Sequence, residues 1–302
     1  MNTEPRTGDN LGGILRMVAA MALFAIEDMF IKFAAVGLPV GQIVFVAGIF
    51  GLPVFVMLAR RQGRRVLTRA AWSLPVLLRN LGEMVGTLGY VTAIATVPLA
   101  TVAAVLQAMP LAVTLGAALF LQEAVGWRRW SAIVVGFAGV LIVIRPGMEG
   151  FRPEALWVLL TVGGLALRDL ASRAIPAAFS DAQVSAWGMA AVTLLGTLMM
   201  AAQGDVRMPE PGQMLFLLGA VAFGTGGYWA ITAATRTGEV SVVAPFRYAR
   251  LVFAILIAIA FFGEYPDAAT LTGAALIIVS GLYAFARERQ RKRGLSLISA
   301  PR

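Results

Sequence analysis

The sequence contains no cysteine and no histidine, and these two absences remove most of the side chains that enzymes use for covalent and metal chemistry. Without cysteine there are no disulfides, iron-sulfur clusters or thiol nucleophiles. Without histidine there is no Ser-His-Asp triad, no His-ligated haem and no His-containing zinc site. We therefore predict no catalytic residue of these kinds and no metal site.

Charged residues are also scarce, at 14% of the chain against 59% apolar residues. A soluble domain usually carries about 25% charged residues, so the composition is typical of an integral membrane protein. The net charge of +9 does not indicate a nucleic-acid partner, because the basic residues follow the pattern of a membrane protein's cytoplasmic loops. The amino-terminal segment lacks a clear cleavage pattern, and we expect it to be retained.

Apolar runs of about 20 residues recur from residue 11 to residue 286, and each is long enough to cross a hydrocarbon core of about 30 Å. We predict an all-α integral membrane protein, because these runs leave little chain for a soluble domain. The ten predicted transmembrane helices are residues 12–34, 40–58, 72–95, 99–121, 127–145, 154–175, 183–203, 212–235, 240–262 and 267–286.

The distribution of basic residues predicts the orientation. With the amino terminus inside, 17 Lys and Arg residues lie on the cytoplasmic side and three on the other side. This bias predicts that both termini are cytoplasmic, in a bacterial-type inner membrane. The basic tail, residues 287–302, is expected to anchor the last helix and to touch anionic lipid headgroups.

The second half of the chain repeats the first with a shift of 141 residues. The shift pairs Asp28 with Asp169, Lys32 with Arg173, and Glu123 with Glu264. Each half, residues 1–145 and residues 154–286, contains five predicted spans. Because five is odd, the second half enters the membrane from the opposite side, which predicts two inverted repeats and an alternating-access carrier.

Two segments near the carboxyl end, PFRYARLVF and FFGEYPDAATLTGAALIIVSGLY, add a family resemblance to this architecture. Together with the two five-span halves, each with a Glu closing its fourth span, they resemble the EamA-type members of the drug/metabolite transporter superfamily. The resemblance covers nearly the whole chain. It implies a carrier with a central substrate cavity and no embedded cofactor, for substrates that range over amino acids, nucleotide-like metabolites, vitamins and drugs.

Ten charged residues fall inside or at the ends of the predicted spans: Glu27, Asp28, Lys32, Arg79, Glu83, Arg168, Asp169, Arg173, Arg247 and Arg250. A charge in a span costs about 3 kcal/mol or more, so such residues face a cavity or a partner. Three pairs are spaced four residues apart and can form ion pairs within one helix: Asp28 with Lys32, Arg79 with Glu83, and Asp169 with Arg173. Local pairing and a shared wet cavity both remain open at this point.

The motif PFRYAR provides the strongest candidate for substrate contact, although pairing of its arginines with Glu83, Asp28 or Asp169 remains open. Pro245 interrupts the ninth span, and Arg247 and Arg250 follow on one helix face, with Tyr248 between them. Gln107 is the repeat partner of Tyr248, and Trp229 adjoins Tyr228. The predicted substrate-binding residues are Arg247, Tyr248, Arg250, Arg79, Glu83, Gln107, Arg168, Tyr228 and Trp229.

Buried carboxyl groups at Glu27, Asp28 and Asp169 are the candidates for proton coupling, although facilitated diffusion and exchange remain open. Glu123 and Glu264 are read as structural or gating caps of their spans. We predict a secondary-active or facilitative transporter of a small polar metabolite, either a monomer or a homodimer, and not an enzyme. The alternatives are a membrane enzyme acting on a lipid or lipid-linked substrate, and a channel or assembly factor.

Overall fold

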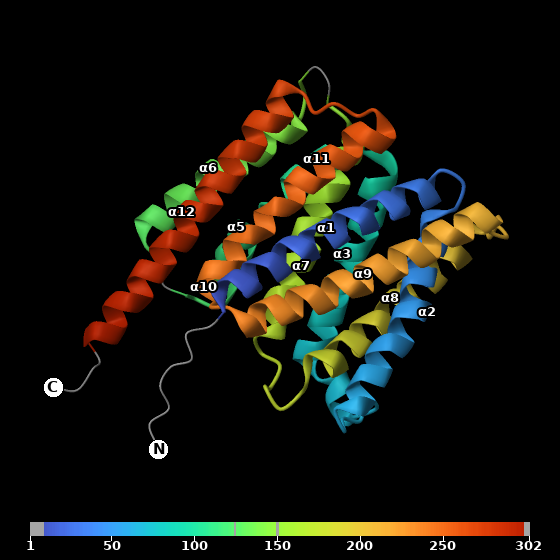
Figure 1. Ribbon diagram of the computed structural model, residues 1–302, viewed down its shortest axis with the longest axis horizontal. Helices are drawn as coiled ribbons and strands as arrows, with labels where there is room; N and C mark the ends of the chain where they lie inside the picture. Colours follow the sequence, from blue (N-terminus) through green and yellow to red (C-terminus); the bar gives the residue numbers. More distant parts are fainter. Residues whose placement is uncertain (1–8, 124, 149–150, 299–302) are drawn as a thin grey trace.

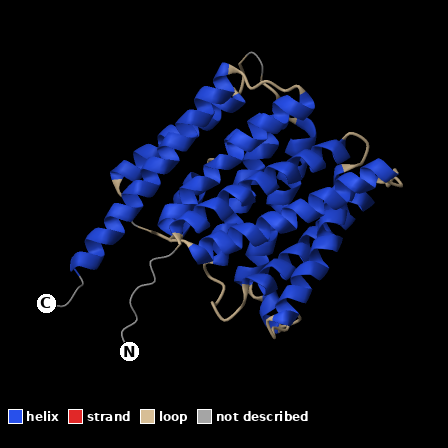
Figure 2. Cartoon of the chain, in the orientation of Figure 1, coloured by secondary structure: helices blue, strands red, loops and turns tan. Residues whose placement is uncertain are grey.

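The computed structural model describes residues 9–123, 125–148 and 151–298, and these residues form only helices and loops (Figure 2). The α-helices are α1 Asn10–Ala35, α2 Val40–Arg61, α3 Leu74–Thr96, α4 Leu99–Leu106, α5 Met109–Phe120, α6 Trp127–Ile144, α7 Leu156–Ser172, α8 Asp181–Gln203, α9 Pro211–Thr237, α10 Val240–Val243, α11 Ala249–Phe262 and α12 Ala268–Ile298. Three 3₁₀ segments are η1 Arg69–Trp72, η2 Pro153–Ala155 and η3 Ala244–Tyr248.

Eight helical stretches in the described ranges are long and apolar enough to cross a membrane. They are α2, α4 with α5, α6, η2 with α7, α8, α9, η3 with α11, and the first part of α12. The prediction of an all-helical integral membrane protein is therefore confirmed. Helices α1 and α3 are of similar length, 26 and 23 residues, but they contain charged residues: Arg16, Glu27, Asp28 and Lys32 in α1, and Arg79 and Glu83 in α3.

The most extensive helix contacts join α1 with α9, α2 with α8, α3 with α7, and α6 with α12 (Figure 1). Glycine allows close backbone approach in these pairs. A Cβ atom added at Gly164 on α7 would lie 2.3 Å from the backbone nitrogen of Gly86 on α3. A Cβ atom added at Gly139 on α6 would lie 2.8 Å from the carbonyl oxygen of Gly273 on α12. The bundle is therefore built from tightly packed helix pairs.

Two transmembrane segments are broken near their middle. Helix α4 ends at Leu106 and α5 begins at Met109, while α10 and α11 are separated by η3. Pro110 is the second residue of α5 and Pro245 lies in η3, and each lacks the N–H group that would continue the hydrogen-bond ladder across the break. The broken backbone places Gln107 and Tyr248, the residues paired by the sequence repeat, beside the same cavity.

Helix α1 begins and helix α12 ends at the same end of the bundle (Figure 1). Helix α12 continues to Ile298, beyond the predicted span end at residue 286, so the start of the predicted basic tail is helical. Residues 299–302 of that tail and residues 1–8 of the amino-terminal segment lie outside the described ranges.

Candidate functional site

A cavity of about 950 Å³ lies inside the bundle and receives side chains from both halves of the chain. Its size is that of a pocket for a small organic ligand. Ten of the residues singled out in the sequence line it: Glu27, Arg79, Glu83, Gln107, Arg168, Asp169, Tyr228, Arg247, Tyr248 and Arg250. The breaks in the fourth and ninth spans therefore open onto the same space as the charges of α1, α3 and α7.

One end of the cavity reaches the connection between α7 and α8, where Ile175, Pro176 and Phe179 line it. The first turns of α8, directly after this connection, are hydrogen-bonded to the connection between α2 and α3. The amide of Gln183 donates to the carbonyl of Arg65 at 2.8 Å, and the indole N–H of Trp187 donates to the carbonyl of Val66 at 2.7 Å. The mouth of the cavity thus lies beside the arginine-rich loop that follows α2.

The first charged group in the cavity wall is formed by Asp28, Arg250 and Tyr90. Arg250 Nη2 lies 2.8 Å from Asp28 Oδ1 and 2.9 Å from Oδ2. Tyr90 donates its hydroxyl hydrogen to Asp28 and accepts one from Arg250. The guanidinium also lies 5.3 Å from the ring centre of Phe24, within cation–π range. Asp28, only 2% exposed, is therefore fully compensated by partners and does not itself line the cavity.

The second charged group joins α3 to α7. Arg79 pairs with Glu83 at 2.7 Å, which confirms the predicted pair within α3. Glu83 also lies 3.4 Å from Arg168 Nη1, and Arg168 Nη2 lies 2.9 Å from Asp169. The group contains two positive and two negative side chains, so it is neutral as a whole, and the Glu83–Arg168 contact links the two helices.

Two of the local pairs considered in the sequence are wrong. Asp28 pairs with Arg250 and not with Lys32, and Asp169 pairs with Arg168 and not with Arg173. Spacing within one helix could not reveal Arg250 as the partner of Asp28, because α11 brings Arg250 against α1 and gives Asp28 a bidentate contact.

Lys32 and Arg173 instead form ion pairs between the two halves of the chain. Lys32 Nζ lies 2.5 Å from Glu264 Oε1, and Arg173 Nη1 lies 2.7 Å from Glu123 Oε1. We call these contacts the Lys32 pair and the Arg173 pair. The sequence repeat aligns Lys32 with Arg173 and Glu123 with Glu264, so the two pairs are repeat equivalents of each other.

Trp229 does not lie at the cavity: it is 71% exposed and is not one of the residues that line it. Neighbouring residues of an α-helix point about 100° apart. Tyr228 faces the cavity and exchanges a 2.7 Å hydrogen bond with the hydroxyl of Ser185, so Trp229 on the same helix points away. Ser185 and Phe24 line the cavity and were missed; Phe24 shares a face with Glu27, three residues further along α1.

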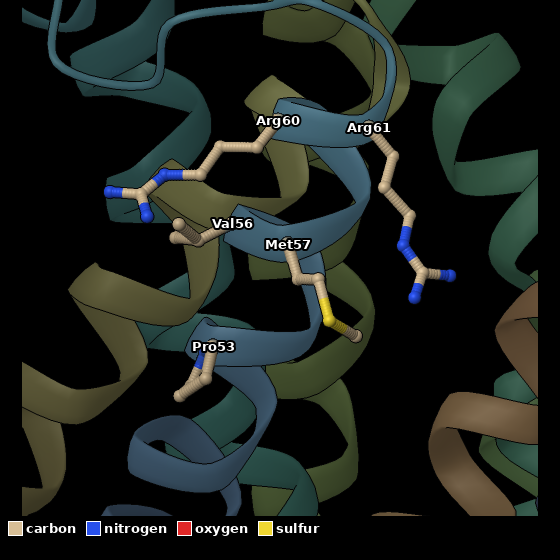
Figure 3. Close-up of a pocket in the computed structure, with 5 residues that line it drawn as sticks. All are labelled: Pro53, Val56, Met57, Arg60 and Arg61. Atoms are coloured by element: carbon tan, nitrogen blue, oxygen red, sulfur yellow. The ribbon is translucent and has the colours of Figure 1, made fainter.

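A second depression, of about 480 Å³, lies on the surface of α2 and is lined by Pro53, Val56, Met57, Arg60 and Arg61 (Figure 3). All five residues come from one helix, and the two arginine side chains point to opposite sides of it (Figure 3). The depression lacks groups that converge on one point, so the central cavity remains the candidate site.

Taken together, the helices and the cavity define a multi-pass membrane protein that encloses a polar site. The sequence profile of the EamA-like transporter family matches residues 11–145 and again residues 152–285. The chain therefore belongs to the EamA-like transporter family. This confirms the resemblance seen in the sequence and the prediction of a transporter, not an enzyme, and such a protein is consistent with a bacterial inner membrane.

Similar proteins include transporters of three different compounds. The S-adenosylmethionine uptake transporter of Rickettsia prowazekii is 25% identical over 280 residues, covering 93% of this chain and 94% of that protein. The riboflavin transporter of Vibrio cholerae is 30% identical over 295 residues, covering 94% and 96%. The pseudopaline exporter CntI of Pseudomonas aeruginosa is 28% identical over 272 residues, covering 89% and 94%.

A solved crystal structure shares the fold, with a TM-score of 0.61 at 20% identity, covering 92% of this chain and 98% of that one. The relatives together establish a transporter of small metabolites.

Proposed function

We propose that this chain is a ten-span carrier that moves a small polar organic metabolite across the cytoplasmic membrane by alternating access. The central observation is a charged cavity between two related halves of the chain, bounded by ion pairs that join those halves. An amino acid, a vitamin or a nucleotide-like compound would fit a cavity of about 950 Å³.

The packing of the helices supports two inverted repeats. The 141-residue shift carries α1 onto α7 and α9 onto α3, so it exchanges the pair α1–α9 with the pair α7–α3. It also maps the pairs α2–α8 and α6–α12 onto themselves. This is the contact pattern of a two-fold axis between halves. With five spans in each half, such an axis runs in the membrane plane.

Counting ten spans requires α1 and α3 to cross the membrane as well. Their charged residues do not argue against this, because Glu27 on α1 and Arg79 and Glu83 on α3 face the cavity rather than lipid. Intramembrane charges are tolerated where they line an aqueous cavity or are paired. With ten spans both termini lie on the same side, and the arginine-rich loop after α2 places that side in the cytoplasm.

In this orientation the cavity is open to the cytoplasm, and the Lys32 pair lies at the opposite, sealed end. We propose that the Lys32 pair closes the outer gate in this conformation and that the Arg173 pair closes the inner gate in the alternative one. Exchange of the two conformations would expose the same cavity to each side in turn.

Of the three carboxyl groups considered for proton coupling, Asp28 and Asp169 are engaged by Arg250 and Arg168. Glu27 is the third, and it lines the cavity. Its electrostatic neighbours are Asp28, Arg250 and Tyr90. We propose that Glu27 exchanges the coupled proton, so that Glu27→Gln removes the dependence of transport on a pH gradient.

The test is counterflow in proteoliposomes. Purified protein is reconstituted in vesicles loaded with one unlabelled compound, and uptake of the labelled compound is followed for S-adenosylmethionine, riboflavin and L-tryptophan. A carrier accelerates uptake when the same compound is present inside, whereas a pore or an enzyme does not. Absence of this acceleration for every compound, in vesicles whose protein is correctly folded, would overturn the proposal.

A further inference from the structure

The charges of the cavity do not all cancel against one another. The Asp28–Arg250 pair is neutral, and so is the group of Arg79, Glu83, Arg168 and Asp169. Three further charged residues line the cavity, Asp181, Arg247 and Glu27, and Asp181 has an interaction of its own. Within the described part of the chain, Arg247 and Glu27 have no hydrogen bond or ion pair with another side chain.

We infer that the cavity binds a zwitterion of the α-amino-acid type, whose carboxylate is held by Arg247 and whose cationic group is held by Glu27. This inference rests on the proposed carrier function and specifies its substrate class. The cationic group would be an ammonium or another onium centre. Because the cavity is larger than a simple amino acid requires, the substrate would carry a bulky substituent against the aromatic walls.

Arg247 is well placed for a carboxylate. It lies in η3, the broken part of the ninth span, where Pro245 interrupts the helix and the side chain is directed into the cavity. A guanidinium offers a planar pair of N–H groups that matches a carboxylate in geometry. Gln107 lines the same cavity, and its buried side-chain nitrogen has no hydrogen-bond partner among the described residues, so a further donor is present for a polar substrate.

Glu27 is well placed for the cationic group. It lies on α1 where Gly224 of α9 makes room for it: a side chain at Gly224 would begin 2.4 Å from Glu27 Oε1. Arg250, the nearest cation, is engaged in two contacts with Asp28, so it does not neutralise Glu27 directly. The ring of Phe24, one turn earlier on the same face, adds an aromatic surface that favours an onium group.

Other charge classes fit less well. An anion would satisfy Arg247 but bring a second negative charge to Glu27, and a cation would do the reverse. An uncharged compound such as riboflavin would displace water from both charged groups without offering either an opposite charge. Only a zwitterion compensates both residues at once.

The test compares matched ligands that differ by one charge. Counterflow and ligand-induced thermal shifts are measured for S-adenosylmethionine and its decarboxylated analogue, and for L-tryptophan, its methyl ester and N-acetyl-L-tryptophan. Riboflavin is the uncharged reference. We expect at least one zwitterion to exchange, and loss of either charge to weaken its binding about tenfold or more.

Two variants test which residue binds the carboxylate of the zwitterion and which binds its cationic group. Arg247→Gln should weaken binding of the zwitterion about tenfold and change binding of its carboxylate-free analogue little. Glu27→Gln should also weaken binding of the zwitterion about tenfold, but it should change binding of the analogue that lacks the cationic group little. The matched controls are Arg61→Gln and Glu154→Gln, which lie outside the cavity and should leave both unchanged. A circular dichroism spectrum and unfolding temperature close to those of the parent protein establish folding of each variant.

The outcomes separate this inference from the carrier function. Exchange of riboflavin without exchange of any zwitterion overturns the inference and supports the carrier. Equal exchange of parent compounds and charge-deleted analogues also overturns it. Absence of counterflow for every compound overturns both the substrate class and the carrier.

Discussion

The Lys32 pair and the Arg173 pair occupy equivalent positions of the sequence repeat but very different surroundings. The side chains of Lys32 and Glu264 are 13% and 24% exposed, whereas those of Arg173 and Glu123 are 47% and 46% exposed. Lys32 also donates to the carbonyl of Val97 at 3.0 Å, and Glu264 accepts from the backbone N–H of Leu99 at 2.8 Å. One pair is therefore embedded in its end of the bundle, and the other is not.

The difference in exposure between the two pairs indicates which end of the cavity is closed in each of two conformations. If the two halves exchange their conformations, each pair should acquire the surroundings of the other. The embedded pair then marks the sealed end of the cavity in the present state, and the exposed pair marks the end that seals in the other state. The same chemical change at the two positions should consequently have unequal effects.

The largest effect is expected for Lys32→Met. Loss of one partner of a buried ion pair costs about 3–5 kcal/mol, and the partial exposure of this pair reduces the cost to about 2 kcal/mol, or about 30-fold in a conformational equilibrium. The variant should shift the protein away from the cytoplasm-open state. Because the chain has no cysteine, Ala177→Cys at the cavity mouth provides a single labelling site for an impermeant maleimide applied from the cytoplasmic side.

We expect labelling at position 177 to slow severalfold in Lys32→Met and transport to fall with it. Lys32→Arg, which keeps the charge, is the matched control and should label at nearly the parent rate. The exchanged double variant, Lys32→Glu with Glu264→Lys, should recover part of the labelling. Unchanged labelling in Lys32→Met would mean that the Lys32 pair does not hold the outer end closed.

A smaller effect on the present conformation is expected for Arg173→Met. An exposed ion pair contributes less than about 1 kcal/mol, so the unfolding temperature and the labelling of the cytoplasm-open state should hardly change. Transport should nevertheless decrease, because the inner gate would lose its ion pair in the alternative conformation. Arg60→Met, another exposed cation at this end, is the control and should transport normally. If Arg173→Met slows labelling as Lys32→Met does, the two pairs do not alternate.

Sequence reasoning predicted the positions of the helices well because span length and hydropathy are local properties. Each of the ten predicted segments coincides with a helix or with a broken helix of the structure. The break beside Tyr248 was also expected from Pro245, since proline acts on the backbone within one turn.

The partners of the charged residues could not be predicted in the same way. Asp28 and Lys32 share a helix face, but their actual partners, Arg250 and Glu264, are more than 200 residues away in the sequence. Trp229 was misplaced because adjacency in sequence was taken for adjacency in the site, although consecutive helical residues point in different directions. The repeat register relates the Lys32 pair to the Arg173 pair, so either contact, once known, would have predicted the other.

The smallest effect is expected at an ion pair that has no equivalent in the sequence repeat. Arg145 and Asp267 form an ion pair between the end of α6 and the start of α12, near the sealed end of the cavity. The repeat equivalents of these residues are Ala286 and Gly126, which cannot form an ion pair. The sealed end thus has an additional electrostatic contact that should favour the present conformation.

Asp267→Asn tests this contribution while keeping a side-chain oxygen for the backbone N–H of Thr270. In the parent protein, the hydrogen bond from Thr270 and the contact with Arg145 lower the pKa of Asp267. A lowered pKa stabilises the folded state above the unfolded-state pKa of about 4, and the stabilisation disappears as the pH falls through the folded-state pKa. The exposed position limits it to less than about 1 kcal/mol at pH 7. Unfolding temperatures in detergent should therefore differ slightly between parent and variant near pH 7, and the difference should shrink as the pH falls below about 4. If the unfolding temperatures differed equally at neutral and at acidic pH, the destabilisation would come from packing at the start of α12 and not from the charge of Asp267. The ion pair that closes this end of the cavity would then be the Lys32 pair, with no electrostatic contribution from Asp267.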